Sequence, residues 1–415
     1  MLPEREYIIL YFAQYAYTRL ERSYPSLRHV YEFQHQKFHR AYPVYPRHHG
    51  LSFFLRPLFD DITDRMPDLV SLNIQTDIPM KLLEFAVVRL LKSLPNLQKL
   101  VLPRFCFTTC IAECVSRLSK LRCIEYHYSH EQGKGDPTDI KIFKPQLMEG
   151  AFPSLWDLSL TTTYDNLQRF FTIPFSPSSI TMLYVESPNV ETLSAIHRLL
   201  VAVSENCQML KLLALISRRR SLEVDLSEDQ INTTRRVTIH TLKPLLACAN
   251  LTSFEIIHQY PLLLQQEDVE TFATRWPLLE TLNLNSEPYD LQWPKLTLEA
   301  LFPFARHCHC LSDLSIFLDA STTLIPKISL SSPPPVISSL NRLSMGLSKI
   351  TASTPVAIFL SHLLPVTCAV DYRVTWLDHL ITVQRRLVNS GFLVRSNHPW
   401  QRVLPLAFSY SSKLL

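Results

Sequence analysis

Two histidines and two cysteines occupy four consecutive positions in the stretch RHCHCLSDLSIF, residues 306–317. Imidazole and thiolate groups are the side chains that zinc and iron select. A second set of thiols, Cys106, Cys110 and Cys114, recurs every four residues, the spacing that places side chains on one face of a helix. Cys123 follows a short way downstream. Both stretches could bind a metal, and the elements that carry them decide whether they do.

One pattern recurs along the chain: an anchor residue, two variable residues, and then LxxLxL. The clear copies are MPDLVSLNI (66–74), LPNLQKLVL (94–102), LSKLRCIEY (118–126), FPSLWDLSL (152–160), CQMLKLLAL (207–215), CANLTSFEI (248–256), WPLLETLNL (276–284), CHCLSDLSI (308–316) and ISSLNRLSM (337–345). A weaker copy, SSITMLYV, lies at 178–185, and a doubtful one, LLPVTCAV, at 363–370. Successive copies are about 30 residues apart, which matches the long end of the leucine-rich-repeat period.

The segments between the copies have the periodicity of amphipathic helices. PMKLLEFAVVRLLKSL (79–94), NVETLSAIHRLLVAV (189–203) and EDVETFATRW (267–276) each place their apolar residues in one stripe. Each unit is therefore a short strand followed by a helix. The sequence predicts an α/β fold, a leucine-rich-repeat solenoid with a parallel concave sheet and outer helices. About eleven units should fill residues 51–390, and residues 391–415 should form a C-terminal tail.

The repeat gives the two thiol stretches a simpler interpretation than metal binding. Cys308 occupies the anchor position, which in other copies is leucine, phenylalanine or tryptophan, so we expect it to be a small buried apolar residue. The stretch FCFTTCIAECV (105–115) fits a helix between repeats, with Cys123 on the next strand as the one partner to check. Packing is the favoured interpretation of both stretches. We expect no metal and no cofactor.

Composition narrows the functional class. The 415 residues are 47% hydrophobic and 19% charged, with only 6 glycines and no GxGxxG or GxxxxGK[ST] motif, which disfavours a nucleotide-dependent enzyme. A net charge of +4 is too small to indicate nucleic acid or a membrane surface as a partner. Nine cysteines without framework spacing indicate reduced thiols, so we expect a cytoplasmic or nuclear protein. We expect a monomer without catalytic residues, and an enzyme remains the least favoured class.

The concave face, or the loops at its rim, is the predicted surface for binding a target protein. In LxxLxL the leucines point into the core, and the alternate residues point outward into the concavity. Those outward positions combine polar groups with scattered aromatic and aliphatic side chains, which can anchor a target protein. The predicted partner-binding residues are Glu125, Asp157, Tyr184, Glu186, Glu255, Ile257, Asn283, Asn285, Asp313 and Phe317.

Several units resemble a known family. CANLTSFEI (248–256), ATRWPLLETLNLN (273–285), LTLEALFPFARHCHCLSDLSIFLDA (296–320) and SSITMLYVE (178–186) are similar to the repeat region of fungal, mushroom-type F-box/leucine-rich-repeat proteins. The resemblance implies a substrate receptor of a cullin-based ubiquitin ligase, whose F-box binds the linker subunit of the ligase and whose repeats bind the target. A leucine-rich-repeat scaffold or signalling adaptor unconnected to ubiquitin is the alternative.

Residues 1–50 depart from the family pattern. Leu2, Pro3 and Glu4 match the opening of an F-box, but the tryptophan of its closing helix is absent. In REYIILYFAQYAYTRL, residues 5–20, the apolar spacing predicts a packing helix. We therefore expect residues 1–50 to be an N-terminal helical cap or a degenerate F-box remnant.

Overall fold

The computed structural model describes residues 59–60, 62–76, 78–126, 135–172, 178–218, 236–288, 294–321, 323, 325–327 and 335–371, and the backbone alone of residues 7–12. The chain divides into two compact units. Unit 1 comprises Met1–Thr162 and Arg169–Ser179, and unit 2 comprises Thr163–Gln168 and Ile180–Leu415. The predicted boundaries at residues 50 and 390 lie outside the described residues.

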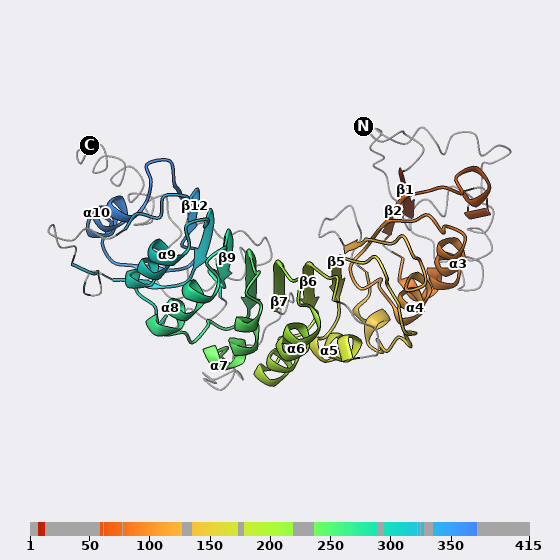
Figure 1. Cartoon of the computed structure of the whole chain (residues 1–415), viewed down its shortest axis with the longest axis horizontal. Helices are drawn as coiled ribbons and strands as arrows, with labels where there is room; N and C mark the ends of the chain where they lie inside the picture. The colour runs from red at the N-terminus through yellow and green to blue at the C-terminus, as the bar shows by residue number, and fades with distance from the viewer. Residues whose placement is uncertain are drawn as a thin grey trace, which may run out of the picture. The chain divides into compact units, whose positions relative to one another are not determined.

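Unit 1 contains a run of parallel strands in chain order. They are β1 (Tyr7–Phe12), β2 (Ser71–Thr76), β3 (Lys99–Leu102), β4 (Cys123–Tyr126) and β5 (Asp157–Thr161). The connections carry α3 (Met80–Lys92), α4 (Thr109–Val115) and the 3₁₀ helix η2 (Pro137–Ile140), while the residues of α5 (Tyr164–Thr172) are divided between the two units. Helices α3 and α4, in orange, lie on one side of the strands of this unit (Figure 1).

Unit 2 repeats the same plan. Its parallel strands are β6 (Met182–Ser187), β7 (Leu212–Ser217), β8 (Ser253–His258), β9 (Thr281–Leu284), β10 (Asp313–Ile316), β12 (Arg342–Ser344) and β14 (Ala369–Asp371). The connecting helices are α6 (Leu193–Asn206), α7 (Ile239–Leu242), η4 (Lys243–Ala247), α8 (Gln266–Arg275), η5 (Leu298–Ala300), α9 (Leu301–His307) and α10 (Ser353–Leu363). Two short strands, β11 (Asp319–Ala320) and β13 (Lys349–Ile350), form a second parallel pair.

The repeated leucines explain this plan, because they stack in register from strand to strand. In unit 1 the register joins Leu72, Leu100, Ile124 and Leu158, all at most 1% exposed. In unit 2 it joins Leu183, Leu213, Phe254, Leu282, Leu314 and Leu343, all fully buried. The predicted fold class is therefore confirmed: the repeats form an α/β leucine-rich-repeat solenoid with a parallel sheet.

The anchor residues close the corner between helix and strand. Trp276 ends α8, is fully buried, and stacks on Phe272 with ring centroids 5.1 Å apart. The edge of its ring also meets Phe254, in the register position of the leucines, at 5.6 Å. One anchor therefore joins helix α8 to β8, the strand that precedes this helix in the chain. The anchors Leu94, Phe152, Cys207, Cys308 and Ile337 are buried in the same way.

The expected helix over residues 5–20 is wrong for residues 7–12. These residues, YIILYF, form β1, which pairs in parallel register with all six residues of β2. The segment consists of β-branched, aromatic and leucine side chains, the types that favour an extended chain, and its apolar spacing did not separate helix from strand. The other residues between 1 and 50, including the rest of the expected cap, lie outside the described residues.

The buried row of leucines predicts that two leucines of one repeat contribute very differently to the stability of the fold. Leu282→Ala, at a fully buried position, should destabilise the fold by about 2–5 kcal/mol, because it removes apolar contacts and leaves a cavity. Leu278→Ala, at a position that is 53% exposed, should change stability by no more than about 0.5 kcal/mol. Urea unfolding followed by circular dichroism measures both. Equal losses at the two positions would contradict the assignment of the core.

Candidate functional site

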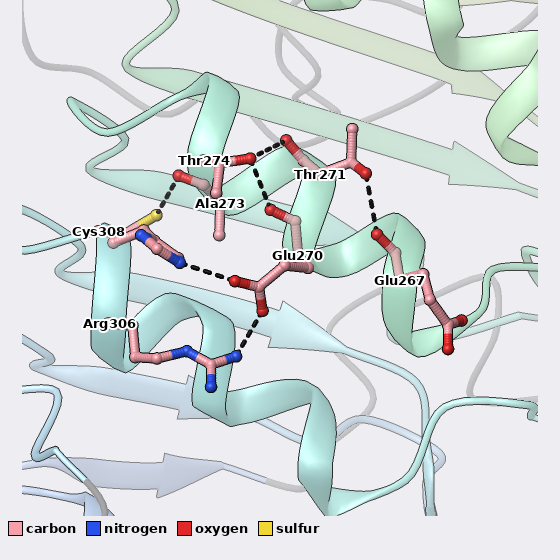
Figure 2. A network of polar contacts seen from close by, with 8 residues as sticks. Glu267, Glu270, Thr271, Ala273, Thr274, Arg306 and Cys308 are labelled. Carbon is pink, nitrogen blue, oxygen red and sulfur yellow. Dashed lines mark hydrogen bonds and ion pairs between the residues drawn. The ribbon is translucent and has the colours of Figure 1, made fainter.

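The RHCHC stretch does not gather its side chains into one site. His307 Nε2 lies 2.7 Å from Glu270 Oε1, and Arg306 pairs with the other oxygen of the same carboxylate. Figure 2 shows this carboxylate of α8 held by two residues at the end of α9. The Cys308 thiol does not join this carboxylate and instead contacts the Ala273 carbonyl oxygen at 3.6 Å. The stretch thus joins two neighbouring repeats.

Burial separates the two cysteines of this stretch. Cys308 is 1% exposed, while Cys310 and His309 are exposed. Burial raises the pKa of the Cys308 thiol to about 12, so it stays protonated at neutral pH. The interpretation of Cys308 as a buried anchor is confirmed.

The three thiols at 106, 110 and 114 do not share one helix face, so that expectation is wrong. Helix α4 begins only at Thr109, after Thr108, whose side chain caps it by accepting a hydrogen bond from the Ile111 backbone N–H at 3.4 Å. Cys106 therefore lies in the preceding turn. Cys106 and Cys114 are buried, whereas Cys110 is exposed. The α-helical spacing was correct for only part of the segment.

The surface best suited to function is the sheet face opposite the helices, which we call the open face. In unit 1 its central row is Ser71, Lys99, Cys123 and Asp157, register partners on β2, β3, β4 and β5. Glu125 belongs to the next row and bends toward this one. Its Oε1 lies 2.8 Å from Lys99 Nζ and 3.1 Å from Cys123 Sγ. Cys123 Sγ also lies 3.3 Å from Asp157 Oδ2.

These groups perturb one another strongly. Burial, the hydrogen bond with Glu125 and the charge of Asp157 raise the pKa of Cys123 far above that of a free thiol. Burial also raises the pKa of Asp157, although the contact with Cys123 partly opposes it. Burial disfavours the charge of Lys99, but Glu125 more than compensates and raises its pKa. At neutral pH the Cys123 thiol is therefore protonated and Lys99 carries its charge.

The open face of unit 2 has two partly exposed rows. One contains Tyr184, Glu255, Asn283 and Ser315, and the other contains Met182, Ser253, Thr281, Asp313 and Arg342. Asn283 Nδ2 donates to Glu255 Oε1 at 2.9 Å, and Arg342 Nε lies 2.9 Å from Asp313 Oδ1. Burial raises the pKa of Glu255, and the Asn283 hydrogen bond partly offsets this effect. Neighbouring strands thus fix the orientation of these side chains.

The ten predicted partner-binding residues divide into two groups. Glu125, Tyr184, Glu255, Asn283 and Asp313 are partly exposed on the open face. Asp157, Glu186, Ile257, Asn285 and Phe317 are buried, with exposed fractions between 0% and 8%.

Asn285 shows why several of these positions are internal. It has a φ of 53° and follows directly after β9, where the chain leaves the sheet. Its Oδ1 accepts a hydrogen bond from the His258 backbone N–H at 3.2 Å, and its Nδ2 donates to the Tyr260 carbonyl at 2.9 Å. The outward alternation stops at the end of the strand, so Asn285 stabilises the turn and does not face a partner.

Two members of the unit 1 cluster were not among the predicted site residues. Lys99 and Cys123 are outward positions of their repeats, so the alternation identifies them individually. Their proximity to Asp157 follows from the register of β3, β4 and β5, which places the same position of successive repeats side by side.

A third set, around Glu191, had no signal in the sequence. The Glu191 side chain accepts hydrogen bonds from Ser187 Oγ at 2.5 Å and from the Tyr164 backbone N–H at 3.0 Å. Its own backbone N–H donates to Ser217 Oγ at 2.6 Å. Burial raises the Glu191 pKa despite these hydrogen bonds. The side chain of Glu191 thus joins the end of β6 to the start of α5, and its backbone N–H joins the same loop to the end of β7, which stabilises this edge of unit 2.

Repeats of this kind, with a regular polar open face, define the class of the molecule: a leucine-rich-repeat protein, an architecture suited to protein interaction. No protein-family model matches the chain, and no curated protein does. Among solved structures, 49 chains match. One is a leucine-rich-repeat protein of Leptospira interrogans, with 13% identity and a TM-score of 0.31 over 75% of this chain and 79% of that one.

Among the described residues, no helix combines the length and the apolar character that crossing a bilayer requires.

The Glu270 pair predicts a pH-dependent contribution to stability. Burial opposes the charge of Glu270, but hydrogen bonds with His307 and Arg306 lower its pKa overall. A carboxyl group with a lowered folded pKa stabilises the fold above its unfolded pKa, about 4.3, and this stabilisation disappears as the pH falls through the folded value. Glu270→Gln should therefore cost up to about 1 kcal/mol at pH 7 and almost nothing near pH 3. Urea unfolding at both pH values tests this, with exposed Glu280→Gln as the control. A cost that is unchanged at low pH would refute it.

The thiols predict a labelling pattern. Cys110 and Cys310 are exposed and the other seven cysteines are buried, so a thiol reagent should label two sites quickly in the folded chain and all nine after unfolding. Mass spectrometry of the labelled peptides assigns them. Rapid labelling of Cys308 alongside Cys310 would contradict the buried anchor.

Proposed function

We propose that this chain is a protein-recognition module that holds a target protein on the open face of its sheet. The observation that carries the proposal is the pair of rows in unit 2. There, partly exposed polar and aromatic side chains recur on β6, β8, β9 and β10, and β7 between them contributes Leu212 and the buried Ala214. Neighbouring strands lie about 4.8 Å apart. Side chains at this spacing on fixed strands form a surface that can contact several residues of a partner at once.

The chemistry of the rows favours a polypeptide ligand. Tyr184 offers a large ring with a polar tip, the side-chain type that concentrates binding energy at protein interfaces. Asn283 and Glu255 offer amide and carboxylate groups that are already held in position by their mutual hydrogen bond. Because these side chains are ordered before binding, less conformational entropy is lost when a partner docks.

Charge adds selectivity to this surface. Asp313 is paired with Arg342, so both signs of charge are present at one end of the rows, while Glu255 adds a second carboxylate toward their middle. A partner with complementary charges would be favoured, and one with a misplaced like charge would be rejected. No catalytic step enters this mode of action. Target binding to a monomer is sufficient.

The finer proposal is that the module is the substrate receptor of a cullin-based ubiquitin ligase. Its support is the resemblance of several repeats, such as CANLTSFEI at 248–256, to fungal F-box/leucine-rich-repeat proteins. In this role the linker subunit of the ligase would bind an F-box-like segment, and the repeats would present the target. The nine free thiols fit a reducing compartment, so we place this function in the cytoplasm or nucleus.

One observation favours the alternative, a scaffold or signalling adaptor without a ligase. Residues 7–12 form β1, the first strand of the unit 1 sheet, where an F-box remnant would be helical. A segment used as a sheet edge is not available in the helical form that a linker subunit would need. The recognition surface would be the same in both cases.

The recognition module is tested with a matched pair of unit 2 variants. The double variant Tyr184→Ala, Asn283→Ala removes two partly exposed open-face side chains. The control, Leu278→Ala, removes a side chain that is 53% exposed and lies outside the strands. Partners crosslinked to the wild-type chain in cell extract are quantified by mass spectrometry. Partners of the open face should fall at least about tenfold with the double variant and remain with the control. An identical set of partners with all three proteins would rule out the open face.

The ligase role has its own test. The purified full chain is mixed with a purified linker subunit of a cullin ligase, and the mixture is run on size-exclusion chromatography. Co-elution supports the receptor role. Separate elution of two folded proteins supports the scaffold and leaves the recognition surface untouched.

A further inference from the structure

The cluster on the open face of unit 1 contains three potential metal ligands. Cys123 and Glu125 lie two residues apart on β4, and Asp157 lies beside Cys123 on β5. One ligand atom from each of the three lies within 4.8 Å of the other two. The three donors differ in type, one thiol and two carboxylates, and come from two rigid strands.

The Cys123 thiol cannot donate a hydrogen bond to both of the carboxylates that lie against it. Cys123 Sγ lies 3.1 Å from a Glu125 oxygen and 3.3 Å from an Asp157 oxygen, yet a thiol carries only one proton. When both acids are ionised, one carboxylate oxygen therefore faces a sulfur lone pair. Cys123 and Asp157 are only 7% and 8% exposed, so water screens this contact poorly. A cation between the three groups would remove the conflict.

The charges also favour a cation. Two carboxylates surround the thiol, and the Lys99 ammonium group, 2.8 Å from Glu125, neutralises only one of them. The two carboxylate oxygens that lie against the thiol sulfur would attract a metal ion in place of the thiol proton.

We propose that Cys123, Glu125 and Asp157 bind a divalent transition-metal ion of the zinc type. A thiolate ligand disfavours magnesium and calcium, while carboxylate oxygens are acceptable to zinc. When the ion binds, the S–H bond breaks, a metal–sulfur bond forms and the proton passes to the solvent. A water molecule would complete four-coordination on the open side of the sheet.

The present distances are close to those the site requires. Tetrahedral zinc with metal–sulfur and metal–oxygen bonds of about 2.3 and 2.0–2.2 Å separates sulfur from oxygen by about 3.5 Å. The two observed separations, 3.1 and 3.3 Å, need to widen only slightly. The Lys99 side chain is 42% exposed, so its ammonium group can turn into the solvent and release Glu125.

This inference departs from the sequence-based expectation of no metal, and it does not depend on the proposed partner binding. Among the thiols considered from the sequence, Cys106, Cys110 and Cys114 do not share one helix face, because Cys106 precedes α4, and Cys123 is the partner that remained to be checked. The proposed ligand set instead uses the strand that follows them and its neighbour.

The test is a titration of the full chain with Co²⁺ alone, followed by competition with Zn²⁺. The exposed Cys110 and Cys310 are replaced by serine in every sample to remove other accessible thiols. A thiolate ligand gives a sulfur-to-cobalt charge-transfer band, which should appear with one equivalent of cobalt and disappear when zinc is added. Cys123→Ser should abolish the band, and Cys114→Ser, at a buried thiol in the same unit, should retain it.

Two further variants keep the proposal falsifiable if Cys123→Ser fails to fold. Lys99→Met removes the competing ammonium group and should tighten cobalt binding at least about threefold, whereas Asp157→Asn should weaken it about tenfold or more. Thermal unfolding without metal checks that each variant is folded. The proposal is overturned if the folded parent protein gives no band, if the band survives in Cys123→Ser, or if Lys99→Met leaves cobalt affinity unchanged.

Discussion

The stacking of aliphatic side chains in register across parallel strands is the interaction on which the structure depends. Each strand contributes one fully buried residue to the row, as Leu282 does between Phe254 and Leu314. A single strand-and-helix repeat cannot bury such a residue by itself, so each repeat is stable only against its neighbours. The same register sets the spacing of every side chain on the opposite face. Core packing and the arrangement of candidate binding groups are thus two results of one constraint.

The sequence predicted the elements that follow the repeat closely. Helices α3, α6 and α8 and the strands from β2 to β10 lie where the leucine pattern and the apolar stripes place them. Even the doubtful copy at 363–370 leads into a strand, β14 at Ala369–Asp371. These elements were predictable because burial of one face gives each of them a regular spacing of apolar residues, and this spacing is visible within a short stretch of sequence.

The errors have local physical causes. The segment YIILYF was expected to be helical because its apolar spacing also fits a helix, and only the edge of β2 selects the extended form. Asn285 was expected to face outward, but the chain turns away after β9 and draws its side chain inward to bond two backbone groups. Cys106 was expected on a helix that in fact begins later, at Thr109, where Thr108 provides the cap. Contacts between strands, such as Cys123 with Asp157, depend on register and cannot be read from one repeat.

The separation of roles between the two faces of the sheet has a consequence for how this molecule can diversify. A leucine in the buried row touches the repeats on both sides, so its replacement disturbs three repeats at once. An open-face residue such as Tyr184 lies on a strand whose backbone position is fixed by the core residues on the other face. Substitutions on the open face can therefore accumulate one at a time. Each can change the partner that is bound without changing the buried core or the backbone.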